Sequence, residues 1–546
     1  MRNQSSDTAP AAERSSWAPM VAIALAQVLM SFNVASLPVA LGGMVQSFGV
    51  PPTTISTGIV MYGLAVAALV MTGAKLGQKF GWVLVFRIVI LTFAAAMGLM
   101  VVAPNVWFMV SAQALAGASA AIIVPALVAL IAENYHGTQQ ATAVGSLGSA
   151  RAASGITAFL VGGLLGTFVG WRPVWVILVV LAALVFVLSF QLRSDTANRA
   201  VKIDGVGAVL IGVAIICLTL GFNNLNAWGV LTASPESPFS VLGLSPAPVL
   251  IVLGIVLGQA FFAWTRKRSQ SGKTPLLSLE VLESKAERSA VYALFVIVAL
   301  EAAINFAIPL YIQIVQGRTP LDTSLAMMPF NLTVFITALV VVRFYSRFPS
   351  RTIARFAFGL STIALLWLAL VVNNDWETIP TIAGLIVFGI GQGALVTLLF
   401  NVLVTSSPKT LAGDVGSLRG VTQNLASAVG TALAGAMLVT LLGGLVTSAL
   451  DESDALPATL KQEVGLDSVN FVSNDQLLTA LAGTSATDSQ IAAAVQINTE
   501  ARLSALKMGL LILAGVSALA IIPVQRLPRY VPDEIPDPEA GSKPVS

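Results

Sequence analysis

Long apolar runs separated by short polar segments repeat along the whole chain. A helix needs about 20 consecutive apolar residues to cross a bilayer, and these runs approach or exceed that length. The pattern predicts fourteen spans: 17–41, 54–73, 83–103, 106–132, 141–168, 172–192, 205–222, 246–265, 289–316, 323–342, 353–372, 379–405, 415–447 and 503–523. We therefore expect an all-α integral membrane protein with fourteen transmembrane helices.

The composition agrees with lipid as the solvent of this chain. Of the 546 residues, 56% are hydrophobic and 10% charged, whereas soluble domains carry about 25% charged residues. The single Cys217 and the single His136 exclude a Cys/His metal site. No nucleophile–base set indicates an enzyme, and no Gly-x-x-x-x-Gly-Lys-Ser/Thr loop for nucleotide phosphates occurs. We expect no cofactor, and the net charge of +3 does not indicate a nucleic-acid partner.

Lys and Arg are distributed unevenly between the two sides that fourteen spans create. With the N-terminus cytoplasmic, 22 lie in cytoplasmic segments and 5 outside, with Arg151 and Arg419 set aside as intramembrane candidates. Cytoplasmic loops carry an excess of basic residues, and a wrong number of spans would scramble this asymmetry. Both termini are therefore predicted to be cytoplasmic, in a protein of the cytoplasmic (inner) membrane.

An internal repeat with an offset of 268 residues organises the chain. The offset pairs basic residues at three places: Lys79 with Arg347, Arg87 with Arg355, and Arg151 with Arg419. This recurrence favours a duplicated transporter half, with chance matches as the alternative. The predicted parts are a tail (1–16), a six-helix half (17–192), two extra helices with their loops (193–288), a second six-helix half (289–525) that includes an outer segment (448–502), and a tail (526–546).

Five short motifs carry a resemblance to a known transporter family. They lie at Gly73–Trp82 after the second span, Gln113–Pro125 in the fourth, Gly162–Trp175 across the fifth and sixth, Lys202–Gly205 before the seventh, and Ile308–Gly317 at the end of the ninth. With these motifs the chain resembles the major facilitator superfamily, specifically the fourteen-helix drug:proton antiporters of the EmrB/QacA type. The resemblance implies two six-helix halves plus two extra helices, with the halves rocking about a central substrate site.

The resemblance also implies that loops on the cytoplasmic side latch the outward-facing state. The gating residues that it indicates are Gly77, Gln78, Lys79, Gly81 and Arg87, with Arg347 and Arg355 at the repeat positions of Lys79 and Arg87. Simple anchoring of basic residues at the cytoplasmic surface explains these charges equally well.

The first half departs from the family pattern at positions that usually carry charge. Gln78 stands where the signature loop has Asp, and Asn33 stands where helix 1 has Asp. Gln113 replaces a helix-4 Arg that is implicated in proton coupling across the family. The resemblance therefore supports the fold, whereas the coupling mechanism does not carry over to this half.

Glu301 is the clearest ionisable residue at membrane depth, far from either end of its predicted span. A charge there costs about 2.5–3.5 kcal/mol on insertion scales, which suggests a role. Asn305 lies one turn further on the same face, and the repeat carries Asn33 onto Glu301. We expect Glu301 to couple protons or bind a cation; a structural carboxyl group hydrogen-bonded within the bundle is the alternative.

Arg151 and Arg419 lie inside the cytoplasmic ends of two spans at equivalent positions of the repeat. If they face a shared cavity, they can close a gate or hold an anionic substrate. Arg side chains also extend back to the membrane surface, so anchoring a helix end or binding a lipid phosphate is the alternative.

We therefore predict a secondary active transporter that exports small amphipathic compounds by alternating access, coupled to protons or another cation. One alternative is a carrier of a specific, for example anionic, solute with altered or no coupling. The other is a transport-inactive receptor or scaffold in the lipid bilayer. The acidic outer segment 448–502 is expected to be solvated and to end in a helix continuous with the last span, with docking of a periplasmic partner as the alternative.

Overall fold

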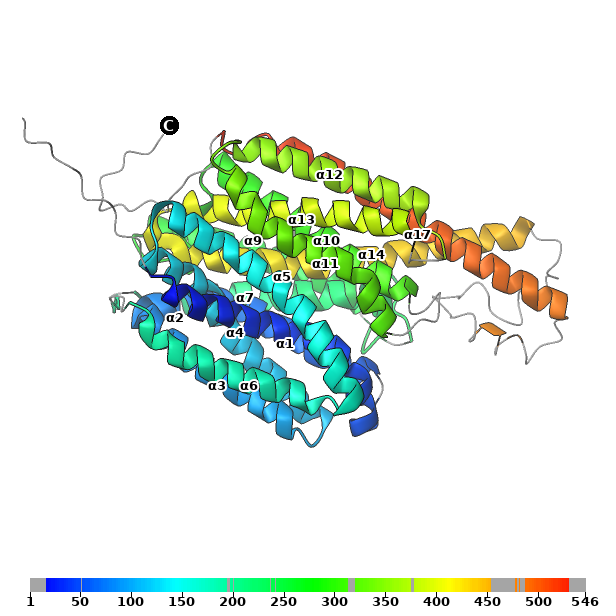
Figure 1. Ribbon diagram of the computed structural model, residues 1–546, viewed down its shortest axis with the longest axis horizontal. Coiled ribbons are helices and arrows are strands. Elements are labelled where there is room, and N and C mark those ends of the chain that lie inside the picture. The colour runs from blue at the N-terminus through cyan, green and yellow to red at the C-terminus, as the bar shows by residue number, and fades with distance from the viewer. Residues whose placement is uncertain are drawn as a thin grey trace, which may run out of the picture.

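The computed structural model describes residues 16–50, 52–193, 197–199, 201–235, 237–240, 242–312, 320–374, 378–452, 477–478, 481 and 487–529. Its long helices are α1 (Ala18–Phe48), α2 (Pro52–Phe80), α3 (Trp82–Val102), α4 (Val106–Asn134), α5 (Gly137–Phe168), α6 (Arg172–Leu188), α7 (Gly205–Asn223), α9 (Pro246–Gln270), α10 (Lys285–Leu310), α11 (Pro320–Val341), α12 (Ser350–Val371), α13 (Ile379–Thr405), α14 (Ala412–Glu452) and α17 (Asp488–Val524). In this part of the chain, 14 helices are long and apolar enough to cross a membrane, as predicted. Figure 1 shows them side by side in one elongated bundle.

Some helix ends differ from the predicted limits. α1 continues to Phe48 and α2 to Phe80, beyond the predicted ends at 41 and 73. The predicted signature loop is therefore mostly the last part of α2, and the chain turns at Gly81, whose φ of 91° suits glycine. α10 ends at Leu310, and the predicted end of the ninth span at 316 lies outside the described residues.

Two six-helix groups with the same internal packing form the bundle. In the first, α1 packs against α5, α2 and α3 against α4, and α3 against α6. In the second, α10 packs against α14, α11 and α12 against α13, and α12 against α17. The repeat converts the first set of helix pairs into the second, so the two halves share one architecture. The two extra helices, α7 and α9, pack on each other, and α7 contacts α2 and α14.

The halves meet along two related seams. α2 packs against α14, and α5 packs against α11. Because the repeat relates α2 to α11 and α5 to α14, each seam is the counterpart of the other, as expected for two similar halves that face each other. α4 also contacts α14, and α13 contacts α5. The space between the halves is therefore bounded mainly by α2, α5, α11 and α14.

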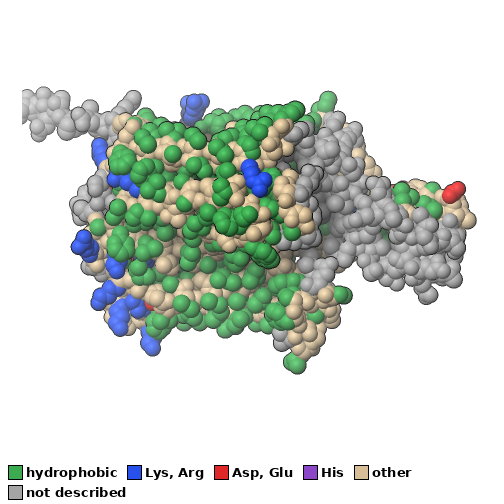
Figure 2. Space-filling view, turned by 90° about the horizontal axis from the view of Figure 1, so that it is seen from below, with side chains coloured by type: hydrophobic (Ala, Val, Ile, Leu, Met, Phe, Trp, Pro, Cys, Tyr) green, Lys and Arg blue, Asp and Glu red, His purple; other side chains and the backbone are tan. Residues whose placement is uncertain are grey.

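Apolar side chains cover the outside of the bundle, while Lys and Arg gather at one end (Figure 2). We call this the basic end; α2, α4 and α6 finish there, and α3, α5 and α12 begin there. The positive-inside rule predicts that the basic end faces the cytoplasm. The described chain also begins and ends here: Tyr135 donates to the Ser16 carbonyl at 3.0 Å, and the N–H of Arg351 donates to the Pro528 carbonyl at 3.4 Å.

At the opposite end α14 and α17 continue past the other helices (Figure 1). They have 41 and 37 residues, or about 60 and 55 Å at 1.5 Å per residue, against about 30 Å of hydrocarbon. A capping box of Thr487 and Gln490 starts α17, which confirms the predicted helix that runs into the last span. Leu442 and Val446 of α14 pack with Ala494 of α17 in this extension.

Replacing Gly430 with Ala is expected to destabilise the second half by about 3 kcal/mol. The added Cβ would lie 2.2 Å from the Ala299 carbonyl oxygen, so the α10 or α14 backbone must move. The matched change Gly155→Ala, with nothing within 4 Å of the added Cβ, is expected to be neutral or slightly stabilising. Thermal unfolding in detergent compares the two variants, and equal midpoints would contradict the tight packing of α10 on α14.

Candidate functional site

Glu301 stands near the middle of α10 and connects the two halves. Its Oε2 accepts a hydrogen bond of 2.8 Å from Nε2 of Gln392 on α13, and its Oε1 lies 3.8 Å from a guanidinium nitrogen of Arg151 on α5. The Glu301 side chain is 20% exposed and that of Arg151 37%, although neither residue is at a helix end. Asn305, one turn along α10, is exposed as well. Glu301 and Arg151 are therefore only partly buried where the two halves meet.

The equivalent pair of side chains in the first half carries no charge. Asn33 on α1 and Gln113 on α4 are fully buried and bond to each other twice, at 3.0 Å from Asn33 Nδ2 and at 3.2 Å from Gln113 Nε2. The repeat relates α1 to α10 and α4 to α13, so the Asn33–Gln113 and Glu301–Gln392 pairs join equivalent helices. Of the two pairs, only the one in the second half contains a group, the Glu301 carboxyl, that can bind and release a proton. Asn33 does not share the exposed space beside Glu301.

Arg419 on α14, the repeat partner of Arg151, is buried beside an aromatic ring. It is 3% exposed, its guanidinium carbon lies 3.7 Å from the Phe400 ring centroid, and its Nε has no hydrogen-bond partner. In the middle of the described spans Glu301 is the one carboxylate, so these two cations outnumber the anions of this region.

Several buried polar atoms of α13 and α5 have no hydrogen-bond partner among the described residues. They include Gln392 Oε1, Thr397 Oγ1 and both amide atoms of Asn401 on α13, and Ser149 Oγ on α5. The helices touch here, because Thr397 Oγ1 would lie 3.1 Å from a Cβ added to Gly148. Buried polar groups are nearly always paired in folded proteins, so these atoms are candidates for hydrogen bonds with water or a substrate.

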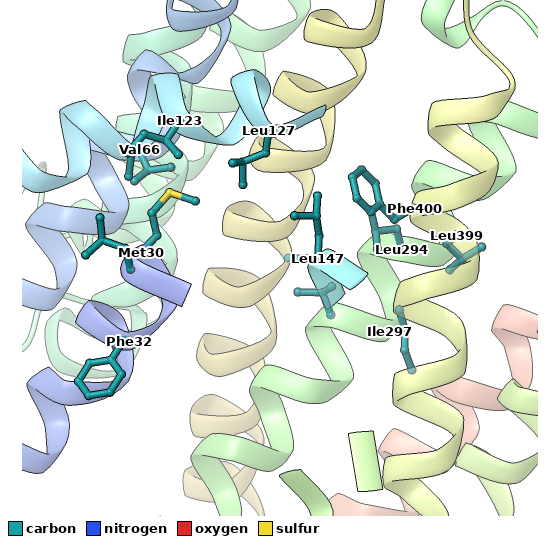
Figure 3. Close-up of a cluster of buried hydrophobic side chains, with 14 of the residues drawn as sticks. Met30, Phe32, Val66, Ile123, Leu127, Leu147, Leu294, Ile297, Leu399 and Phe400 are labelled. Carbon is teal, nitrogen blue, oxygen red and sulfur yellow. The ribbon is translucent and has the colours of Figure 1, made fainter. Parts of the chain in front are cut away.

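An apolar layer lies between the Glu301–Arg151 pair and the basic end. Leu147 precedes Arg151 by one turn of α5, and Leu294 precedes Glu301 on α10; both leucines are 0% exposed. Figure 3 shows Leu147 from the first half grouped with Leu294 and Phe400 from the second. Because close-packed side chains leave no room for water, this layer separates Glu301 and Arg151 from the basic end.

Lys75 and Asp414 form a buried salt bridge across the α2–α14 seam at the basic end. Lys75 Nζ lies 2.9 and 3.0 Å from the two carboxylate oxygens, and the side chains are 4% and 1% exposed. Gln78 Nε2 donates to Asp414 Oδ1 at 3.2 Å, and the N–H of Ser278 donates to Oδ2 at 2.9 Å. Ser278 belongs to the segment between α9 and α10. Asp414 thus joins both halves and the chain that connects them.

Glycines let the helices approach closely at the basic end. A Cβ added to Gly77 would lie 2.1 Å from the Trp82 indole, and one added to Gly413 would lie 2.5 Å from the same ring. The Trp82 ring therefore fills the space between α2 and α14. On the other seam, a Cβ added to Gly145 would lie 2.7 Å from Val342. Gly145 and Gly413 are separated by the repeat offset, so a glycine allows close approach at the equivalent place of each seam.

The predicted gating residues fall into two groups. Gly77 and Gln78 lie in the α2–α14 contact, and Gly81 makes the turn that brings Trp82 there. Arg87 instead donates to the carbonyl of Ser189 at the end of its own half, at 3.1 Å. Among the described residues, no hydrogen bond or ion pair to the other half is seen for three further candidates: Lys79, Arg347 and Arg355. A gating role for these basic residues stays a prediction.

The sequence does not single out the strongest contact between the halves. Lys75 contributes to the basic asymmetry, and Asp414 is an acid in the first turn of a helix, where it also complements the helix dipole. The charge pattern explains Lys75 and the helix dipole explains Asp414, so nothing in the sequence around either residue indicates a partner 339 residues away. Gln392 is equally inconspicuous in the sequence, because Asn and Gln residues occur in several of the predicted spans.

Comparison with known proteins gives the family. Residues 23–431 match the family model described as Major Facilitator Superfamily. The chain belongs to the major facilitator superfamily. This membership confirms the resemblance stated from the motifs and accounts for the two-half bundle. Its relatives in this superfamily are transporters, not enzymes.

Among curated relatives, the chain is 25% identical over 483 residues to the probable actinorhodin transporter of Streptomyces coelicolor, covering 85% of this chain and 79% of that one. It is 23% identical over 459 residues to the multidrug resistance protein Stp of Mycobacterium tuberculosis, covering 83% and 81%. It is 25% identical over 423 residues to the multidrug efflux pump LfrA of Mycolicibacterium smegmatis, covering 77% and 80%.

Solved superfamily structures have the same fold. The human organic anion transporter MFSD10 superposes with a TM-score of 0.55 at 12% identity, over 93% of this chain and 99% of that one. The proton:xylose symporter XylE superposes with a TM-score of 0.56 at 10% identity, over 95% and 98%. At these identities the comparison establishes the fold and leaves the cargo open.

Proposed function

We propose that this protein is a secondary active exporter of small amphipathic compounds in the cytoplasmic membrane, with Glu301 as its coupling acid. The observation that carries the proposal is the place of Glu301, bonded to Gln392 in its own half and 3.8 Å from Arg151 of the other. A carboxylate between two halves changes its surroundings whenever the halves move. The relatives named for multidrug resistance and efflux support export as the direction.

The arrangement of the halves supports an outward-facing state. The salt bridge of Lys75 with Asp414 and the Trp82 packing close the basic end, which the charge pattern predicts to be cytoplasmic. Glu301 and Asn305 nevertheless retain exposed surface on the side of the apolar layer that faces away from the basic end. In the alternating-access cycle that we propose, the salt bridge opens when the halves rock, and the same site then faces the cytoplasm.

A proton and the substrate compete for Glu301, and this competition couples substrate export to proton entry. When ionised, its carboxylate accepts hydrogen bonds from Gln392 and from donor groups of a substrate, and it pairs with Arg151. A proton arriving from the outer side removes this charge and weakens the hold on the substrate. After the halves rock, the proton leaves to the cytoplasm and the ionised carboxylate binds the next substrate. Proton entry thereby drives export.

A second candidate is a carrier of anionic solutes, and Arg419 is the observation that favours it. Its Nε is unpaired, and together with Arg151 it gives the site more positive than negative charge. An anion that pairs with Arg151 displaces Glu301, which then takes up a proton. Proton and anion would bind together, whereas proton and exported amphipath compete.

Substrate addition to purified protein in weak buffer is expected to release up to about one proton per protein, because competition couples substrate binding to deprotonation. A pH indicator measures the released protons. The variant Glu301→Gln is the control, since it binds substrate without a titratable group and should give no signal. Proton uptake on binding would favour the anion carrier instead.

Flux in proteoliposomes tests the transport claim itself. The protein is reconstituted and loaded with a fluorescent amphipath, and a pH gradient is imposed. Gradient-dependent movement of the dye supports an exporter. Binding without any flux in either direction would support the receptor or scaffold alternative. Docking of a periplasmic partner on segment 448–502 stays a separate prediction.

A further inference from the structure

A shallow, open groove of about 420 Å³ lies on the outer face of α12 near the basic end. Its lining comes from one stripe of the helix at spacings of three and four residues: Thr352, Arg355, Phe356, Gly359, Leu360 and Ile363. Polar side chains occupy the end of the stripe nearest the start of α12, and apolar ones the rest. The groove therefore has a polar head and an apolar body.

The groove faces the membrane rather than another helix. Phe356 is 69% exposed and Ile363 61%, and further along the same face Leu370 is 75% exposed. α12 packs with α13 and α17 on its other sides. Side chains this apolar and this exposed on a spanning helix lie against lipid tails. The occupant of the groove is therefore a membrane component.

Arg355 at the head of the groove has no protein counter-charge. It is exposed, and no described carboxylate forms an ion pair with it. Its neighbour Arg351 is different, because its guanidinium donates to the carbonyl of Leu527 at the end of α17. Arg355 lies at the basic end, where lipid phosphates of that leaflet are found. Its charge is thus available to a phosphate at that depth.

The first half lacks this arrangement at the equivalent positions. Arg87, the repeat partner of Arg355, bonds to Ser189 and lies 4.3 Å from the Phe190 ring centroid. Gly359 corresponds to Leu91, which is 49% exposed. A Cβ added to Gly359 would meet nothing within 4 Å, so the glycine opens the trough that a leucine fills in the first half. The asymmetry arises from the side chains, since the two halves share one architecture.

We propose that the α12 groove binds an anionic phospholipid of the leaflet at the basic end. Arg355 and Thr352 hold the headgroup phosphate, by a charge-assisted hydrogen bond and a hydroxyl hydrogen bond. One acyl chain lies in the trough above Gly359, between Phe356 and Ile363. This site is separate from the space around Glu301 and does not depend on which compound is transported.

Native mass spectrometry of the full-length protein in detergent tests the site, with phosphatidylglycerol and phosphatidylcholine added in separate titrations. Wild type is expected to retain one phosphatidylglycerol more tightly than phosphatidylcholine. Arg355→Gln should lower the apparent affinity for phosphatidylglycerol by about tenfold, as expected for loss of a charge-assisted hydrogen bond. Gly359→Leu should weaken both lipids, because it fills the trough.

Arg87→Gln is the matched control and should leave lipid retention unchanged. Gel filtration and thermal unfolding verify that each variant is folded, and Arg355→Gln alone decides the question if Gly359→Leu does not fold. Equal retention of phosphatidylglycerol by wild type and Arg355→Gln would overturn the proposal. An equal loss in Arg87→Gln and Arg355→Gln would also overturn it, because the effect would then be one of net charge.

Discussion

Glu301→Gln is expected to abolish transport driven by a pH gradient while leaving substrate exchange across the membrane within about threefold of wild type. The amide keeps the size of the carboxyl group and still accepts a hydrogen bond from Gln392, but it cannot bind and release a proton. Among the described residues, no other carboxylate lies in the middle of a span to replace it. The halves should therefore still rock, without proton coupling.

Proteoliposomes measure both activities on the same preparation. Gradient-driven uptake is recorded with an imposed pH difference, and exchange is recorded as counterflow of labelled substrate at equal pH. Asn33→Ser is the matched control, since Asn33 occupies the equivalent position of the neutral link in the first half. It should keep the pH dependence. Normal gradient-driven uptake by Glu301→Gln would refute the coupling role.

Asp414→Asn is expected to shift the protein from the state closed at the basic end toward the open one by at least about 150-fold. Lys75 would then be a buried cation without a counter-charge, and breaking one partner of a buried pair costs about 3–5 kcal/mol. That cost applies in the closed state and is relieved when the seam opens to water. The equilibrium between the two states therefore moves toward opening.

Distance measurements between spin labels follow this shift. Cys217 is the single cysteine, so Cys217→Ser gives a background for labels at two exposed residues, Phe80 at the end of α2 and Thr410 before α14. Wild type should give mainly the short distance, and Asp414→Asn should add a longer component. Transport should fall as well, because the cycle needs both states at comparable energy.

The double variant Lys75→Met/Asp414→Asn separates charge from packing. It leaves no unpaired buried charge, and the amide oxygen introduced in place of the Asp414 carboxylate can still accept from the N–H of Ser278. Most of the closed population should therefore return. A closed population in Asp414→Asn equal to that of wild type would show that the salt bridge does not hold the seam. Failure of the double variant to recover would point instead to the shape of the Trp82 contact.

The sequence by itself determined the membrane architecture. Long apolar runs specify spanning helices, because a backbone in lipid must satisfy its own hydrogen bonds within the helix. The 268-residue offset indicated the duplicated half, and the outer segment was expected to end in a helix continuous with the last span, as the structure has it. Glu301 stood out for the same reason, since a carboxyl group at bilayer depth is costly wherever the chain folds.

Tertiary structure alone decided the partners of these residues. It joined Glu301 to Gln392 and Arg151, which lie on three helices far apart in the chain, and it paired Lys75 with Asp414. It also showed the predicted signature loop to be largely the end of α2. The pattern of apolar residues and the local helix propensity show which segments form helices and whether those helices lie in lipid or in water. Which polar side chains meet depends on helix rotation and depth, which the packing of the whole bundle sets.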